Sequence, residues 1–307
     1  MMRILVGAVI SLALCTAAQA AAQETLPLPV RIEGPAHIEL SLVKSERRDG
    51  GPEQRAAFTY EVSLTSADKD TGRRGVIWRL ASVDGVRVEA GSSPSPDIRM
   101  TVDQNLTPVS LDNLDEVIDF TRRQLAESGE LDEAGESAIQ MLAALTPETA
   151  APLFTRDATM VAQGQGTELI PGETNTYEFE GALPWGGASV TMIGSYQLAE
   201  VNRTTGKARV IWSQEIDPAS LHDAVPAMID ALISQSGEAN DNVDVAAKMR
   251  AEMAGATLDN SRRCEFTIDM ATGLAEKIDC LTTIAFVAGD ESARRENRLI
   301  ASQHLKR

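Results

Sequence analysis

Two segments of this chain repeat one pattern: a Thr-Gly pair, a basic residue and then a Val-Ile-Trp run. They span residues 71–78 and 205–212. Before the first pair, the apolar residues Phe58, Tyr60 and Val62 alternate with polar ones. Such alternation is typical of a half-buried strand, and glycine readily adopts the positive φ of a tight turn. Each copy therefore predicts a β-hairpin whose second strand ends in tryptophan.

A third Thr-Gly pair, Thr272-Gly273, lies between two further strand-like runs, each of which holds one cysteine. A hairpin register can place Cys264 and Cys280 on neighbouring strands, and a facing pair meets the Cα separation of about 4.4 to 6.8 Å that a disulfide needs. We predict a structural disulfide that closes a loop of about 15 residues. A redox-active pair is disfavoured because the spacing is not Cys-x-x-Cys; two separate buried thiols are the alternative.

The first 20 residues have the pattern of an export signal. Arg3 supplies a positive charge, residues 4–14 are apolar, and Ala18-Gln19-Ala20 is a small-x-small cleavage motif. We predict a signal peptide over residues 1–20 and a periplasmic or secreted protein without a later transmembrane segment. Lipid attachment at Cys15 and retention as an anchor are the alternatives. If Cys15 leaves with the signal, the remaining even number of cysteines agrees with one disulfide.

The charge balance limits the partners. The chain has 45 acidic and 28 basic residues, a net charge of −17, and only 4% aromatic residues. A negative field of this size repels phosphate-rich surfaces, and few aromatic rings are available for base stacking. Nucleic acid and the surface of anionic lipid are therefore poor candidates as partners, whereas basic proteins and divalent cations remain open. The basic C-terminal residues 294–307 are predicted to be a solvated strand and tail.

Helical periodicity interrupts the strands in both parts of the chain. Ser110 is the expected N-cap of a helix that Gly129 ends, and a second short helix is expected over residues 138–145. Later, Asp217-Pro218 has the N-cap and first-turn proline that open a helix. Helices therefore accompany the hairpins of both parts.

Residues 184–187, Pro-Trp-Gly-Gly, have the composition of a hairpin tip. An aromatic side chain at such a tip can contact a partner, so Trp185 is the candidate contact residue. The alternative is that Trp185 folds back onto the sheet.

The motifs for catalysis and metal binding are absent. The chain has three histidines, no G-x-S-x-G elbow and no spacing of His or Cys that suits zinc. Residues 68–72 resemble the start of a calcium loop, but the glycine falls one place early and the closing glutamate is missing, so a hairpin turn is expected there. We predict no catalytic residues, no metal site and no cofactor, and hence not an enzyme.

The order of elements resembles a group of exported bacterial proteins of unknown function that are built from duplicated β-rich halves. A hairpin with a Thr-Gly turn is followed by a helical stretch, a Pro-Gly-Glu segment and another hairpin. The residues concerned are Pro171-Gly172-Glu173, Tyr177, Tyr196 and Gly206. Tyr177 stands where the pattern has tryptophan. The resemblance implies an architecture and a location outside the cytoplasm but no reaction.

From these patterns we predict an α+β fold of curved antiparallel sheets, built from repeated β-hairpins, with helices packed on one side. The halves are residues 21–157 and 158–307, and the second holds the disulfide hairpin. Curved sheets with a helical cover can enclose a cavity, and this outline is similar to periplasmic lipoprotein-carrier folds.

The leading functional hypothesis is a non-catalytic protein of the cell envelope. Its binding partner is either an apolar or amphipathic ligand or another envelope protein. A structural or assembly protein that acts through protein–protein contacts is the first alternative, and an unrecognised enzyme is the second. A large apolar cavity would favour the carrier, whereas a filled core with an exposed apolar patch would favour the assembly protein.

Overall fold

The computed structural model describes residues 24–89, 93–182, 189–221, 223–224, 257–288 and 291–306. The predicted signal peptide, residues 1–20, lies outside them, and so does most of the helix predicted after Pro218. At its start, Asp217 Oδ2 accepts a hydrogen bond from the Ser220 backbone N–H at 3.0 Å, and residues 218–221 are helical. Asp217 therefore caps a helix, as predicted.

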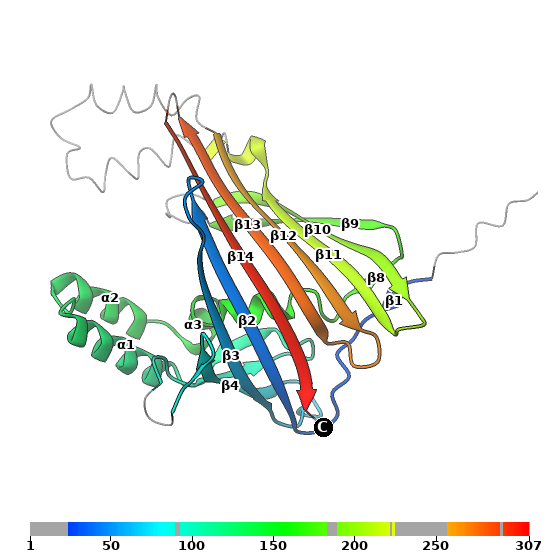
Figure 1. The fold of residues 1–307 in the computed structure, drawn as a ribbon, viewed down its shortest axis with the longest axis horizontal. Helices are drawn as coiled ribbons and strands as arrows, with labels where there is room; N and C mark the ends of the chain where they lie inside the picture. Colours follow the sequence, from blue (N-terminus) through cyan, green and yellow to red (C-terminus); the bar gives the residue numbers. More distant parts are fainter. Residues whose placement is uncertain are drawn as a thin grey trace, which may run out of the picture.

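Within the described residues, twelve strands form one antiparallel sheet with the order β7-β6-β4-β3-β2-β14-β13-β12-β11-β10-β9, and β5 pairs with β4 (Figure 1). A separate small sheet consists of β1 (Leu26–Pro27) and β8 (Glu168–Leu169). The strands of the large sheet are β2 (Ala36–Arg48), β3 (Gln54–Leu64), β4 (Arg74–Val83), β5 (Val86–Arg87), β6 (Ile98–Val102), β7 (Pro108–Leu111), β9 (Thr174–Ala182), β10 (Ser189–Asn202), β11 (Lys207–Ile216), β12 (Thr257–Asp269), β13 (Ala275–Ala288) and β14 (Glu291–Lys306).

The predicted hairpins are present. β3 pairs with β4, β10 with β11 and β12 with β13. The glycines of the three Thr-Gly turns, Gly72, Gly206 and Gly273, have φ of +69°, +67° and +71°. These are left-handed conformations that glycine adopts without the steric cost that a Cβ brings.

The predicted α+β class with separate sheets was wrong, because the strands of both parts form a single, mostly β structure. A repeated hairpin pattern shows where strands form but not which strands become neighbours. Here the last strand, β14, pairs with the first long strand, β2, in the register Ala301↔Leu42. This pairing joins the hairpins of both parts into one sheet.

β14 also corrects the prediction that residues 294–307 are a solvated strand and tail. The strand lies in the interior of the sheet between β2 and β13, and Leu299, Ala301 and Gln303 are buried. Its basic residues Arg298 and Lys306 belong to exposed positions that alternate with these buried ones, whereas Arg295 shares the face of Leu299. The alternation of buried and exposed residues, rather than the number of basic residues, therefore indicates that this segment is an interior strand.

Four helices are described between β7 and β8: α1 (Leu114–Ser128), α2 (Glu133–Ala143), α3 (Pro147–Phe154) and α4 (Arg156–Ala162). α1 and α2 lie beside the sheet in Figure 1, and their buried side chains share a cluster with Leu111 of β7. This position at the β7 edge is a further departure from the predicted fold, in which helices cover a sheet face. Gly129 ends α1 with φ +77°, as predicted.

We call the side of the sheet that bears Leu40, Phe266 and Cys280 the inner face. These residues belong to the main hydrophobic core, to which α4 contributes Ala158 and Val161. The opposite, outer face carries the alternate residues, including ion pairs such as Arg298–Asp279 at 2.5 Å. One face of the sheet is thus apolar over much of its area and the other is charged, as expected for a sheet covered on one side.

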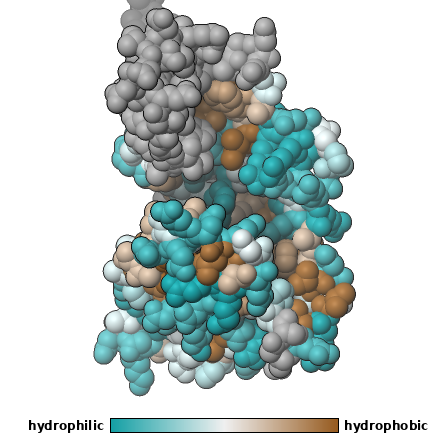
Figure 2. All heavy atoms as spheres, turned by 90° about the vertical axis from the view of Figure 1, so that its left-hand side faces the viewer, coloured by the Kyte–Doolittle hydropathy of each residue, from teal (hydrophilic) through white to brown (hydrophobic). Residues whose placement is uncertain are grey.

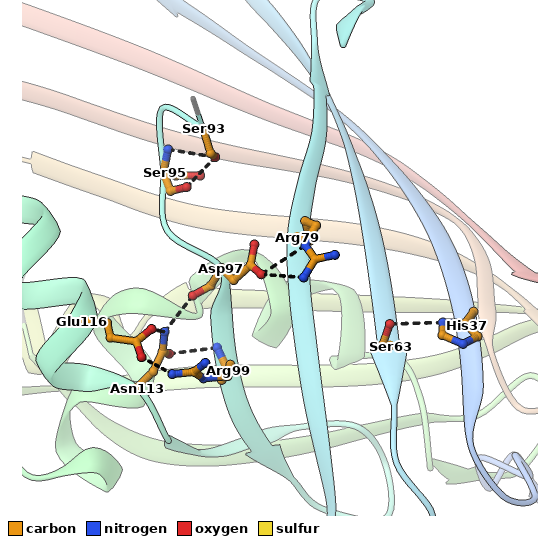
Figure 3. A network of polar contacts seen from close by, with 9 residues as sticks. All are labelled: His37, Ser63, Arg79, Ser93, Ser95, Asp97, Arg99, Asn113 and Glu116. Carbon is orange, nitrogen blue, oxygen red and sulfur yellow. Dashed lines mark hydrogen bonds and ion pairs between the residues drawn. The ribbon is translucent and has the colours of Figure 1, made fainter. Parts of the chain in front are cut away.

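α1 begins after Asn113 rather than Ser110, which is a correction to the predicted cap. Ser110 belongs to β7, where its hydroxyl donates to Asp112 at 2.7 Å. Asn113 is only 4% exposed. Its Oδ1 accepts from the Arg99 backbone N–H at 2.9 Å and its Nδ2 donates to the Asp97 carbonyl at 2.8 Å (Figure 3). Asn113 therefore ties the start of α1 to β6.

Neighbouring side chains extend this network. Asn113 also donates to Glu116 Oε2 at 3.2 Å, and Glu116 pairs with Arg99. The hydrogen bond from Asn113 and then that from Arg99 lower the pKa of Glu116. Asp97 pairs with Arg79 of β4 at 3.0 Å.

Substitution Asn113→Ala is expected to destabilise the helical hairpin by about 2 kcal/mol, because it leaves two partly buried backbone groups, the Arg99 N–H and the Asp97 carbonyl, without their partner. Amides of α1 and α2 should then exchange with deuterium faster, while those of β12 and β13 should not change. Ser110→Ala is the matched control and should leave α1 unaffected. Equal effects of the two substitutions would contradict the assignment of Asn113 as the anchor.

Candidate functional site

The inner face is hollowed where the core ends. A cavity of about 670 Å³ lies next to α4 and is lined from β2, β3, β12, β13 and β14. Figure 2 faces the side of the molecule that carries α1 and α2, and shows a hollow between its lower and upper parts. We call this cavity the inner hollow.

The sequence explains why the inner face opens here. Along β12, the inward positions pass from Ile268, Phe266 and Cys264, all fully buried, to Arg262 and Asn260, which line the hollow. A charged side chain keeps its head group accessible to water. The core therefore stops at Cys264, and the polar part of the face remains open.

The predicted disulfide marks this boundary. Cys264 and Cys280 face each other across β12 and β13 in direct register, and they form a disulfide with a Cα–Cα distance of 4.0 Å. The prediction from the hairpin pattern is confirmed. The next facing pair on the same side is Arg262 and Thr282, so the disulfide lies directly beside the residues that line the hollow.

The lining carries an excess of positive charge. Six basic and two acidic residues contribute to it. Asp157 is paired with Lys44 at 2.5 Å, and Glu46 is paired with Arg295 at 2.7 Å. Arg298 pairs with Asp279 of the outer face. The three remaining basic residues, for which the described residues provide no carboxylate within ion-pair distance, are Arg55, Arg156 and Arg262.

Arg262 is the most enclosed of these cations. Its Nε donates to Thr282 Oγ1 at 3.0 Å, and its guanidinium lies 6.0 Å from the ring centroid of Trp212, close enough for a cation–π contact. Burial, and secondarily the charge of Arg156, lower the pKa of Arg262. Arginine nevertheless remains protonated in proteins, so the hollow contains a partly desolvated positive charge.

An aromatic row holds Trp212 in place. Trp212 Nε1 donates to the Tyr177 hydroxyl at 2.7 Å. The Tyr177 and Tyr196 rings stack with centroids 5.7 Å apart, and the Tyr196 hydroxyl donates to the Gln163 carbonyl at 3.1 Å. Burial raises the pKa of Tyr196, so its hydroxyl stays protonated. The row fixes the position of the Trp212 ring, which contacts the guanidinium of Arg262.

The candidate contact residue Trp185 lies outside the described residues. The segment from Asp68 to Gly72 is a turn in which Asp68 Oδ1 accepts from the backbone N–H groups of Asp70 and Thr71 at 3.1 and 2.8 Å. This is the turn that was predicted in preference to a calcium loop. In the described part of the chain, no group of three or more His, Cys, Asp or Glu residues is placed to hold a metal ion.

One serine–histidine contact is present. His37 Nδ1 lies 3.1 Å from Ser63 Oγ on the outer face, where His37 is exposed and Ser63 is partly buried (Figure 3). A catalytic triad needs a third group that orients the histidine, and among the described residues no carboxylate makes a hydrogen bond to His37. The contact alone gives no reason to assign catalysis.

Within the residues that the structure describes, no helix has the length and apolar character needed to cross a membrane.

Comparison with known proteins gives little further information. No protein-family model matches the chain, and no curated protein matches it. A structure described as "Lipid-protein interactions in lipovitellin" aligns with 90% of this chain at 9% identity and a TM-score of 0.46. The alignment covers 26% of that chain, so this protein spans about a quarter of its length.

A second structure, DynF from the dynemicin biosynthesis pathway of Micromonospora chersina, aligns with 92% of this chain and 86% of its own. The identity is 7% and the TM-score 0.19. At TM-scores below 0.5, neither similarity supports an argument about function.

Proposed function

We propose that this protein is a non-catalytic binding protein that holds an amphipathic ligand in the inner hollow. The observation that carries the proposal is a hollow bounded by both the sheet and α4, with a volume of about 670 Å³ that falls within the range of about 300 to 1,000 Å³ of small-molecule sites. The depression on the outer face has a similar volume, about 730 Å³, but strands alone line it. The wall of the inner hollow combines aliphatic side chains, Met160, Ile284 and Leu299, with charged ones. A ligand with an apolar part and a polar head group matches such a wall.

A purely apolar ligand fits less well. The void inside the hydrophobic core, between β2, β3, β4, β6 and α4, has a volume of only about 30 Å³, roughly the space of a single water molecule in the liquid. An acyl chain has no room there without unpacking the core. Of the two ligand classes that the sequence left open, the amphipathic one is therefore preferred.

The proposed location is the periplasm or the extracellular space. The Cys264–Cys280 bond supports this part of the proposal, because disulfides persist mainly in oxidising compartments.

One observation favours the assembly alternative. Leu281 of β13 and Ile300 of β14 are each 42% exposed, and both line an open depression on the outer face. Such a spot can contact another protein of the envelope. It involves only two large apolar side chains, whereas a specific interface usually buries about 800 Å² on each partner.

Ligand binding in the hollow can be tested with a matched pair of variants. We expect 1-monodecanoylglycerol or decanoate to bind the full mature chain with one site per molecule in isothermal titration calorimetry. Ile284→Trp should obstruct the apolar part of the wall and weaken binding about tenfold or more, because the larger ring takes the space along which the apolar part of the ligand would lie. Leu281→Trp, on the outer face of the same strand, should have no effect.

Two results would contradict the proposed function. One is the absence of binding by every amphiphile tested, and the other is an equal loss of affinity in the two tryptophan variants. Native mass spectrometry of protein purified without detergent supplies an independent check, because a ligand held in the hollow should appear as an added mass that the Ile284→Trp variant lacks.

A further inference from the structure

The inner hollow concentrates positive charge in a strongly acidic protein. The whole chain has a net charge of −17, yet basic residues outnumber acidic ones by six to two in the lining. The paired side chains Lys44–Asp157 and Arg295–Glu46 account for both carboxylates. Arg156 and Arg262 therefore have no compensating charge among the described residues.

Two uncompensated cations close to each other are unfavourable. Arg156 repels Arg262 strongly enough to lower its pKa, in addition to the effect of burial. Arg156 is exposed, so the cost falls on Arg262, whose unpaired charge is partly buried. A protein that keeps such a pair without a counter-ion loses stability, and a bound anion would recover it.

The position of Arg262 suits anion recognition. Its Nε is occupied by Thr282 Oγ1 at 3.0 Å, which fixes the plane of the guanidinium, and Trp212 supports that plane. The structure gives no hydrogen-bond partner for its two terminal nitrogens among the described residues. A guanidinium held in this way presents donors that match the two oxygens of a carboxylate or phosphate.

We infer that the inner hollow binds the oxyanion head group of an amphipathic ligand, with Arg262 as the bidentate donor and Arg156 as the second cation. The head group is a carboxylate or a phosphate monoester, which present the same oxygens to arginine. The apolar part of the ligand lies along Met160 and Ile284. This inference rests on the proposed function and specifies the ligand class of that site.

The test compares three ligands with the same chain length: decanoate, decyl phosphate and the uncharged 1-monodecanoylglycerol. We expect at least one of the anions to bind the full mature chain about tenfold or more tightly than the uncharged ligand. Arg262→Gln should remove this difference and leave the affinity for 1-monodecanoylglycerol unchanged. Arg263→Gln, which changes the neighbouring arginine on the outer face of the same strand, is the control and should keep the preference.

Trp212 provides a second readout. Because its ring lies against Arg262, binding of the anion should change its fluorescence in a Trp78→Phe, Trp185→Phe background, and Arg262→Gln should abolish the change. A preference for decyl phosphate alone or for decanoate alone would support the inference and identify the head group.

The inference and the proposed function can fail separately. Equal affinity for charged and uncharged ligands, or an Arg262→Gln variant that keeps the anion preference, would overturn the oxyanion site while the proposed function stands. Failure of all three ligands to bind would overturn both. A melting temperature for Arg262→Gln close to that of the unchanged protein would show that the variant is folded.

Discussion

Replacement of both Cys264 and Cys280 by alanine is expected to lower the free energy of unfolding by about 3 kcal/mol or more. The bond closes a loop of about 15 residues, and in the chain-entropy model its loss restores that much freedom to the unfolded chain. A second cost arises because both cysteines are at most 1% exposed, so the removed sulfurs leave a cavity in the core. Alanine is preferred to serine because it buries no hydroxyl group.

Urea unfolding of the mature protein measures the effect, and a reductant provides the control. Dithiothreitol should destabilise the unchanged protein but leave the double-alanine variant unaffected. The free energy of ligand binding should change by less than the free energy of unfolding, because the disulfide lies beside the inner hollow and not in its lining. Unfolding of the double variant at the same urea concentration as the unchanged protein would mean that the disulfide is not structural.

The local features of this fold follow from the sequence, whereas the neighbours of each strand do not. A Thr-Gly turn between alternating strands determines its own hairpin, and in this way the register that brings Cys264 to Cys280 was predictable. The pairing of Ala301 with Leu42 joins residues at opposite ends of the chain. Nothing in the alternation of either strand specifies the other, so the single sheet could not be predicted.

The inward position of Arg262 could have been predicted from the sequence, whereas its contacts could not. In a strand, residues two apart lie on the same face, so a buried Cys264 implies that Arg262 also points inward. A charge at an inward position indicates a polar site. The contacts that define the site come from Thr282, Trp212 and Arg156, which are distant in the sequence, and these required the structure.

The substitution Gly164→Ala is expected to destabilise the protein by about 3 kcal/mol, at the upper end of the usual cost of overpacking. Gly164 follows α4 and lies against Phe266, which is fully buried. A Cβ at this position would be 2.4 Å from Cγ of Phe266, far inside van der Waals contact. Neither side can move easily, because Gln165 accepts a hydrogen bond from the Ala275 backbone N–H at 3.2 Å and so ties this segment to β13.

A double-mutant cycle separates this clash from a general effect on the turn. Phe266→Ala alone should cost about 4 kcal/mol through the cavity it leaves. In the double variant the alanine Cβ enters the space vacated by the ring. The double variant should therefore lose less stability than the sum of the losses of the two single variants. Urea unfolding of the four proteins gives the coupling energy. Strict additivity would show that Gly164 is required for its backbone conformation and not for contact with Phe266, and α4 would then not depend on this contact for its position beside the inner hollow.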